Sequence, residues 1–531
     1  MAGRGGPTTW RDVLAVRRSY VVAAVAVLAV AAVFVRFWSL TSVGFNSDEA
    51  VYSGQAAAMA GDSTYSHLFG VFRAHPLVVQ FLVSLVDRVF GVSELGPRAL
   101  CAVAGVMLVG LSGLIGWRVI GPLGGLLTMA LVALSPFAVI VSRQMLLDGP
   151  EAVFAALTLL LLVLHAQTGR RPLIYAAAAA AGLTFLCKET GILFGPAIGL
   201  YLLFARDLNL RRADVLGALG VYILCLLPYP ISVALGGGGQ VAQQFFVWQL
   251  FRRANHPLGF YLTDVGPSIG IPLLVFAAVG AFFAFRRRRT VDILLLSFTL
   301  VPLVFYVFWP VKGYEYVLPI IVPLTVLAVK GLLGIATMLA GAVAFARERR
   351  IHWTRVYALA LTAVCTVPML AGTTTVLASQ NAASIAGSGT DSEDISGQTP
   401  STFIAGTGGL QGGREAGQWV HDHTLSDSTF LTIGPTFANI IQFYGVRRAL
   451  GLSVSPNPLS RNPVYQAVPN ADLLIRSGAI QYLVWDRYSA ARTSFFSNRV
   501  LALVKKYHGT VVYSLHLQDV GTAVTIWAVR P

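Results

Sequence analysis

The sequence predicts a mainly α-helical fold: a polytopic membrane bundle of about eleven transmembrane helices, followed by a C-terminal extracytoplasmic α/β domain. Of its 531 residues, 55% are hydrophobic and only 12% are charged, whereas about a quarter of the residues of a soluble domain are charged. Apolar runs long enough to cross a bilayer recur between residues 19 and 378. After residue 379 the composition becomes polar, which indicates a separate domain outside the membrane.

The N-terminal segment predicts an uncleaved first helix with its N-terminus in the cytoplasm. Four arginines precede the first apolar run, and no cleavage site follows it. The eleven predicted spans are residues 19–40, 97–119, 123–142, 150–168, 173–187, 190–205, 214–235, 267–285, 291–309, 317–345 and 354–377.

Positive charge fixes the orientation of these spans. Lys and Arg cluster at 169–172, 206–214, 286–290 and 347–355, all on the side that the first helix assigns to the cytoplasm. The net charge of +15 is therefore explained by topology, and no nucleic-acid partner is expected. The spans 173–187 and 190–205 are short, so we expect the "CKETG" between them (187–191) in a dent of the membrane or near its outer surface.

The same orientation defines the external parts. Residues 41–96 form a large first external loop, in which 76–90 is expected to be a helix along the outer face because Asp87 and Arg88 lie near its end. The chain divides into a transmembrane module (1–378), a polar linker (379–404) and an external domain (405–531) in which strand-like runs alternate with helical ones. The four cysteines lie in apolar runs and indicate neither disulfides nor a zinc site.

Two adjacent carboxylates, Asp48 and Glu49, follow the first span almost at once. They suit the first turn of a helix, where acids are favoured and Asn46 or Ser47 is the cap. They equally suit acid–base chemistry at a membrane surface. The pair by itself leaves both interpretations open.

The other external loops carry further charge. Each residue has a structural alternative, since Trp, Tyr and Lys are common at membrane interfaces. Cations on the outside are nevertheless suited to a lipid phosphate or pyrophosphate, and a neighbouring carboxylate could deprotonate an attacking hydroxyl. The loops contain Arg143, Asp148 and Glu151; then Arg252, Arg253 and His256; then Lys312, Tyr314 and Tyr316.

Several stretches resemble the GT-C glycosyltransferases, in particular the branch of the protein O-mannosyltransferases and the lipid A aminoarabinose transferases. They are "FNSDEAVY", the "HPL" at 75–77, "SELGPRAL" (93–100), "SRQMLLDGPEAVF" (142–154), "CKETGILFGPAIGLYLL" (187–203) and "KGYEYVLPIIVPL" (312–324). The resemblance covers residues 19 to about 378. It implies transfer of a sugar from a polyprenyl phosphate carrier to an acceptor hydroxyl on protein, lipid or polysaccharide, at the outer face of the plasma membrane and with inversion.

The resemblance also implies residue roles. Asp48 would be the general base, Glu49 its support and Asp148 a second acid near the site, with Asp48 and Asp148 available to a divalent metal such as Mg or Mn. As an alternative role, Lys188 and Glu189 would pair with each other. The carrier phosphate would meet Arg143, Lys312, His256 and Arg253, and the sugar or lipid would meet His75, Tyr52, Tyr314, Tyr316, Lys188 and Glu189.

Two other classes fit a polytopic protein with polar external residues. A lipid or polysaccharide transporter or flippase would place ionisable groups near mid-membrane in repeated halves, and no such repeat is visible. An acyl or phosphoethanolamine transferase would need a nucleophile or a His and metal set, which the sequence does not present.

Overall fold

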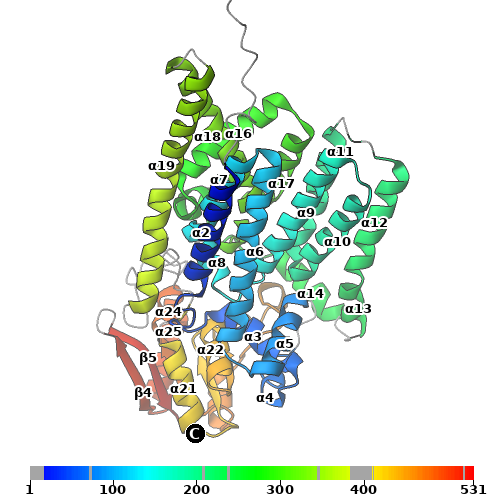
Figure 1. Ribbon diagram of the computed structural model, residues 1–531. Helices are drawn as coiled ribbons and strands as arrows, with labels where there is room; N and C mark the ends of the chain where they lie inside the picture. Colours follow the sequence, from blue (N-terminus) through cyan, green and yellow to red (C-terminus); the bar gives the residue numbers. More distant parts are fainter. Residues whose placement is uncertain are drawn as a thin grey trace, which may run out of the picture.

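The computed structural model describes residues 17–70, 75–205, 208, 210–235, 239–343, 347–382, 409–410, 412–517 and 521–530. It consists of a helical bundle with a small sheet domain at one end (Figure 1). The predictions for residues 1–16 and for most of the linker at 379–404 lie outside the described residues.

Each of the eleven predicted spans coincides with a helix or a helix pair. Seven described helices are long and apolar enough to cross a membrane: α2 (Arg18–Phe37), α6 (Leu95–Val119), α9 (Asp148–Thr168), α12 with α13 (Arg212–Leu226 and Pro228–Leu235), α17 (Thr290–Phe308), η3 with α18 (Glu315–Ile320 and Ile321–Val343) and α19 (Arg347–Ala382).

The remaining spans are bent or short. Helices α7 (Pro122–Ala133) and α8 (Pro136–Ser142) meet at 60°, and Tyr261–Ile269 (η2 and α15) meets α16 (Ile271–Arg287) at 104°. The two short spans are α10 (Pro172–Cys187) and η1 with α11 (Glu189–Leu193 and Phe194–Phe204). Between them the chain becomes extended at Lys188, so the predicted break at "CKETG" is present.

The first external loop folds into helices at one end of the bundle. These are α3 (Ser47–Ala60), α4 (Ser63–Ser66) and α5 (Val78–Phe90), which lie beside the sheet domain in Figure 1. Helix α5 buries Val79 and Val83 but exposes Val89 and Phe90. A helix with one face packed and another apolar face exposed is suited to lie along a membrane, as the sequence predicts for 76–90.

The C-terminal domain is a five-stranded sheet covered by helices. Its strand order is β2-β1-β3-β5-β4, with β1 parallel to β2 and β3, and β5 antiparallel to β3 and β4. The strands are β1 (Thr429–Thr432), β2 (Arg448–Gly451), β3 (Tyr482–Asp486), β4 (Thr510–Leu517) and β5 (Gly521–Ala528). The helices are α21 (Gly413–His423), α22 (Pro435–Tyr444), α23 (Ala471–Arg476), α24 (Arg487–Arg492) and α25 (Ser494–Lys506), with the short turn η4 (Pro458–Ser460). The predicted α/β domain is thus present.

The sheet domain and the first external loop share a hydrophobic core. Phe45 and Phe69 are buried together with residues of α21, α22 and the sheet. The hydroxyl of Tyr444 accepts a bond from the backbone N–H of Phe45 (2.7 Å) and donates to Glu94, which also pairs with Arg414. The start of α3 is therefore held by both parts of the molecule.

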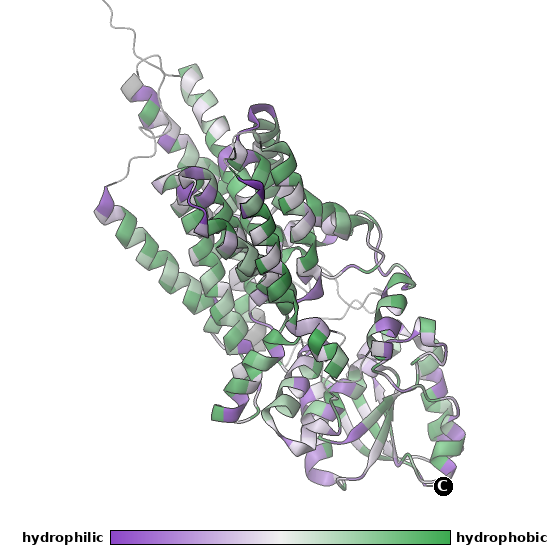
Figure 2. Cartoon of the chain, turned by 90° about the vertical axis from the view of Figure 1, so that its right-hand side faces the viewer, coloured by the Kyte–Doolittle hydropathy of each residue, from purple (hydrophilic) through white to green (hydrophobic). Residues whose placement is uncertain are grey.

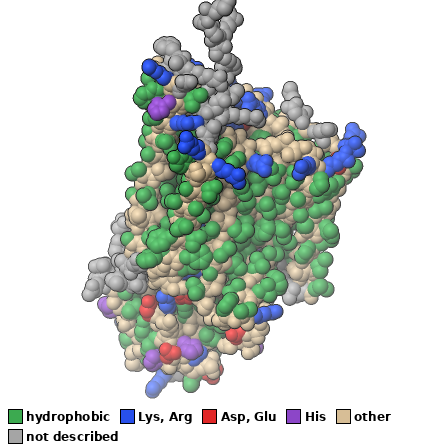
Figure 3. Space-filling view, in the orientation of Figure 1, with side chains coloured by type: hydrophobic (Ala, Val, Ile, Leu, Met, Phe, Trp, Pro, Cys, Tyr) green, Lys and Arg blue, Asp and Glu red, His purple; other side chains and the backbone are tan. Residues whose placement is uncertain are grey.

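Hydrophobic and positively charged residues occupy different parts of the surface of the bundle. Green hydrophobic residues dominate its helices in Figure 2. In Figure 3, Lys and Arg gather at the end of the bundle away from the sheet domain. This arrangement agrees with the predicted cytoplasmic clusters, one of which contains Arg286 and Arg287 in the last turn of α16.

Candidate active site

Glu49, and not Asp48, completes the cap of α3. The backbone N–H of Glu49 donates to Asn46 Oδ1 (2.9 Å), and the backbone N–H of Asn46 donates to Glu49 Oε2 (3.1 Å). This reciprocal capping box satisfies two backbone donors at the start of the helix. The capping interpretation therefore holds for Glu49, while the side chain of Asp48 stays outside the cap.

Glu49 does not support Asp48 by direct contact. It is fully buried, and Arg98 of α6 binds both of its oxygens, with Nε to Oε1 and Nη2 to Oε2 each at 2.7 Å. The backbone N–H of Met145 also donates to Oε1 (2.9 Å). Arg98 also donates hydrogen bonds from Nη1 and Nη2 to the backbone carbonyls of the residues just before α3. Glu49 is thus a positioning residue, and Arg98, to which the sequence analysis gives no role, is its partner.

Asp48 is exposed to solvent although protein surrounds it closely enough to raise its pKa. Loss of hydration is the largest cause; the charges of Lys188, Arg252 and His75 act in the opposite direction. Tyr52 follows one turn later in α3, and burial together with Asp48 raises its pKa. A carboxylate with a raised pKa beside several cations is typical of a functional site.

The break between α10 and η1 supplies two ion pairs close to Asp48. Lys188 Nζ lies 2.7 Å from Asp148 Oδ1 and 4.3 Å from the ring centre of Tyr316. Although burial disfavours its charge, Asp148 raises the pKa of Lys188. Glu189 Oε2 lies 3.1 Å from His75 Nδ1. The alternative that Lys188 and Glu189 pair with each other is wrong, because the extended backbone at Lys188 sends the two side chains to different partners.

Two residues near Asp48 were not among the predicted site residues. Arg252, after α14 (Gly239–Leu250), lowers the pKa of Asp48 and stacks on Trp248 at 4.5 Å. Glu315, at the start of η3, lies close enough for its charge to act on Lys188. The prediction chose the neighbouring Arg253, which is exposed. Sequence spacing cannot decide which of two adjacent arginines faces inward.

Arg143 departs from its predicted role. Its guanidinium is buried and donates to the carbonyls of Val35 (2.8 Å) and Trp38 (2.6 Å) at the end of α2. The last carbonyls of a helix lack partners within the helix, and a nearby cation satisfies them. These donors are therefore committed to α2 and do not face Asp48.

The third and fourth external loops meet in one cluster, which contains Lys312, His256 and Tyr314. Lys312 is buried, and its Nζ donates to the carbonyl of Trp309 (3.0 Å). Asn255 joins the third and fourth external loops by two bonds of 2.8 Å to the backbone of Lys312. His256 stacks on Phe260, which also contacts Tyr314. Burial lowers the pKa of Lys312, and among the described residues no carboxylate forms an ion pair with it.

The described residues do not present a metal-ligand set. No three His, Cys, Asp or Glu side chains come together within the described ranges. Asp148, one of the two predicted ligands, already holds Lys188 at 2.7 Å. A site for Mg or Mn needs several oxygen ligands, so no chemical step is assigned to a metal.

Comparison with known proteins identifies the fold. Residues 74–231 match the family model described as dolichyl-phosphate-mannose-protein mannosyltransferase. The structure of ArnT from Cupriavidus metallidurans bound to undecaprenyl phosphate is similar over 96% of this chain and 98% of that chain (TM-score 0.62, 18% identity). Its apo structure gives a TM-score of 0.65 at 20% identity, with the same coverage. The chain has a GT-C glycosyltransferase fold.

A second solved GT-C structure extends the likeness. The oligosaccharyltransferase of Archaeoglobus fulgidus, tethered to an acceptor peptide, matches over 97% of this chain and 74% of that chain (TM-score 0.56, 14% identity). No curated protein sequence matches the chain significantly. The resemblance to the GT-C glycosyltransferases seen in the sequence is thus confirmed, and the residues gathered around Asp48 lie at the end of the bundle that carries the sheet domain.

Proposed function

We propose that the protein is a membrane glycosyltransferase that moves a sugar from a polyprenyl phosphate carrier to an acceptor hydroxyl outside the plasma membrane, with inversion. One observation carries the proposal: Asp48 is solvent-accessible and lies within electrostatic reach of Lys188, Arg252 and His75. A carboxylate beside cations suits a reaction that removes a proton from a hydroxyl on one side and releases a phosphate on the other. The GT-C fold and the undecaprenyl phosphate bound to the similar ArnT support it.

The chemistry follows from these groups. Asp48 takes the proton of the acceptor hydroxyl while the acceptor oxygen bonds to the anomeric carbon. The bond from that carbon to the phosphate oxygen breaks, and its electron pair leaves with the polyprenyl phosphate. Lys188 and Arg252 stabilise the negative charge that grows on the leaving phosphate. Tyr52 and Tyr316, which lie next to Asp48 and Lys188, contact the sugar.

The location of the reaction follows from charge. The Arg-rich helix ends lie away from the sheet domain (Figure 3), and cytoplasmic loops carry an excess of Lys and Arg. We therefore propose that Asp48, its neighbours and the C-terminal domain lie outside the cell, where a lipid-linked sugar and its acceptor meet.

The direct test is sugar transfer by full-length protein in nanodiscs that contain undecaprenyl phosphate sugars. Asp48→Asn should fold and insert normally but transfer sugar roughly 100 to 10,000 times more slowly, because the acceptor keeps its proton. Asp62→Asn is the matched control: Asp62 lies in the same external loop and caps α4, a role that Asn also fills. Equal turnover by Asp48→Asn and Asp62→Asn would remove Asp48 as the base.

A further inference from the structure

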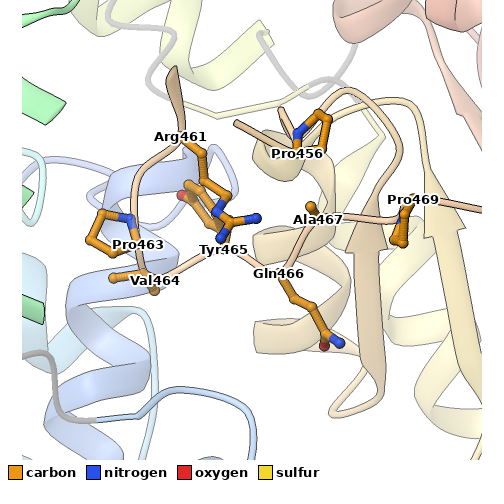
Figure 4. A pocket seen from close by; sticks show the side chains of 8 residues that line it. All are labelled: Pro456, Arg461, Pro463, Val464, Tyr465, Gln466, Ala467 and Pro469. Carbon is orange, nitrogen blue, oxygen red and sulfur yellow. The ribbon is translucent and has the colours of Figure 1, made fainter. Parts of the chain in front are cut away.

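The C-terminal domain forms a cavity beside the start of α3. The cavity has a volume of about 500 Å³ and is lined by one stretch of chain between residues 456 and 469. Figure 4 shows Arg461, Tyr465 and Gln466 on this stretch, between the blue ribbon of the first external loop and the sheet. Three prolines, Pro456, Pro463 and Pro469, complete much of the remaining wall.

A buried amide connects this cavity to the catalytic helix. Asn439 of α22 donates from Nδ2 to Ser47 Oγ (2.9 Å) and to the hydroxyl oxygen of Tyr465 (3.0 Å). Ser47 directly precedes Asp48, so one side chain fixes the Tyr465 hydroxyl beside the residue that carries the base. The Tyr465 oxygen accepts this bond, and within the described part of the chain its own proton has no acceptor, so the hydroxyl can donate to a ligand.

The charge of Asp48 also acts on tyrosines of the C-terminal domain. Burial and the charge of Asp48 raise the pKa of Tyr465 to about 12, while the hydrogen bond from Asn439 and the charge of Arg252 lower it. Asp48 also contributes to the raised pKa of Tyr488 in α24, for which burial is the main cause. Asp48 is therefore near enough to both tyrosines to act on them electrostatically.

We propose that this cavity is the acceptor subsite and binds a carbohydrate unit whose hydroxyl is presented to Asp48. Tyr465 donates to that unit, and Arg461 and Gln466 set its specificity. The inference rests on the proposed glycosyl transfer. It goes further in naming the acceptor class and in giving the C-terminal domain a role in binding.

Size, chemistry and position favour a sugar. A volume of about 500 Å³ is in the range of pockets for small ligands. A phenol, an amide and a guanidinium together offer the donors and acceptors that match several hydroxyl groups. The lipid carrier arrives from the membrane and so from the side of the helical bundle, which contributes Lys188. The cavity belongs to the C-terminal domain and is available to the acceptor.

Kinetics separate this role from the donor site. Tyr465→Phe keeps the ring and removes one hydrogen bond, so the KM for a glycoside acceptor should rise about tenfold, while the KM for the undecaprenyl phosphate sugar stays unchanged. Tyr507→Phe is the matched control, because the Tyr507 hydroxyl bonds to Asp472 of α23 and, in the part of the chain that the structure describes, to no other residue. An unchanged acceptor KM, or a change in the donor KM instead, would overturn the proposal.

A labelling experiment tests the cavity without turnover. Gln466→Cys in the full-length protein places a thiol at the exposed wall of the cavity, and Ser477→Cys places one at the exposed end of α23 as the control. A panel of methyl glycosides and disaccharides should include a compound that slows maleimide labelling at 466 severalfold and leaves 477 unaffected. The proposal is overturned if no glycoside protects residue 466, or if only a Ser/Thr peptide or undecaprenyl phosphate does. Because no sugar is transferred, this result stands even if the proposed reaction fails.

Discussion

At the scale of single residues, two neighbouring acids, Glu49 and Asp48, have different roles in the proposed site. Glu49 gives all of its hydrogen-bonding capacity to Arg98 and to backbone groups. Asp48 keeps its carboxylate facing solvent, with a pKa raised by the surrounding protein. A base whose pKa lies above the usual carboxyl range accepts a proton more readily near neutral pH. Glu49 thus fixes the first turn of α3 and holds Asp48, the proposed base, in place.

The pH dependence of transfer tests this arrangement. The proposed base acts in its ionised form, so activity should fall as pH decreases through the raised pKa of Asp48. Arg252 lowers that pKa, and Arg252→Gln should therefore move the acidic limb of kcat/KM to higher pH. Arg253→Gln removes the same charge from an exposed neighbour and should leave the limb in place. Equal behaviour of the two variants would show that Arg252 does not act on the base.

Particular residues show what the sequence could and could not predict here. Motifs along the chain predict Asp48, Asp148 and Lys188 as site residues. They do not predict the pairing of Lys188 with Asp148, since it depends on an extended backbone between two helices. Arg143 donates to helix carbonyls, and the charge of Arg252 acts on Asp48. Both outcomes depend on the direction of a side chain, which the charge and spacing of residues in the sequence leave open.

At the scale of elements, α3 is the part that must be placed accurately. Its first turn is held by the capping box, by Arg98 of α6 and by the amide of Asn439 in α22. Three elements far apart in sequence therefore converge on one helix start. The helices themselves were predictable from apolar runs and charge clusters. The convergence was not, because long-range contacts leave no local pattern.

Stability measurements test the anchor of α3. Glu49→Gln leaves the buried guanidinium of Arg98 without its counter-charge, and loss of one partner of a buried pair costs about 3–5 kcal/mol. Asn46→Ala removes only a cap and should cost about 1 kcal/mol. Thermal unfolding in detergent should rank the two variants in this order. The double variant Glu49→Gln, Arg98→Met should recover part of the loss; a fully additive loss would show that the two side chains are not coupled.

At the scale of the whole molecule, residues of the helical bundle and of the C-terminal domain contribute to the proposed site. The bundle contributes Lys188 and Asp148, and the C-terminal domain contributes Tyr465 and its cavity. A lipid-linked donor and a polar acceptor have opposite solvent preferences, so a site at this boundary lets each approach from its own phase. The sequence predicted both domains and the order of the spans, whereas their shared core became visible only in three dimensions.

Topology is tested by accessibility in intact cells. A membrane-impermeant maleimide should label Ser477→Cys in the C-terminal domain from outside. It should reach Arg288→Cys, between α16 and α17, only after the cells are opened, because that residue lies in a positive cluster. Labelling of Arg288→Cys in intact cells would show that the orientation is the reverse of the predicted one and that Asp48 lies on the cytoplasmic side.

The position of a bound carrier tests the central claim, that acids and cations from distant loops form one glycosyl-transfer site. We expect a structure of the full-length protein with undecaprenyl phosphate to place the phosphate about 3 Å from the side-chain nitrogens of Lys188 or Arg252, with Asp48 one sugar ring away. A phosphate bound instead at Arg143 or Lys312, with Asp48 out of reach of the attached sugar, would contradict the account.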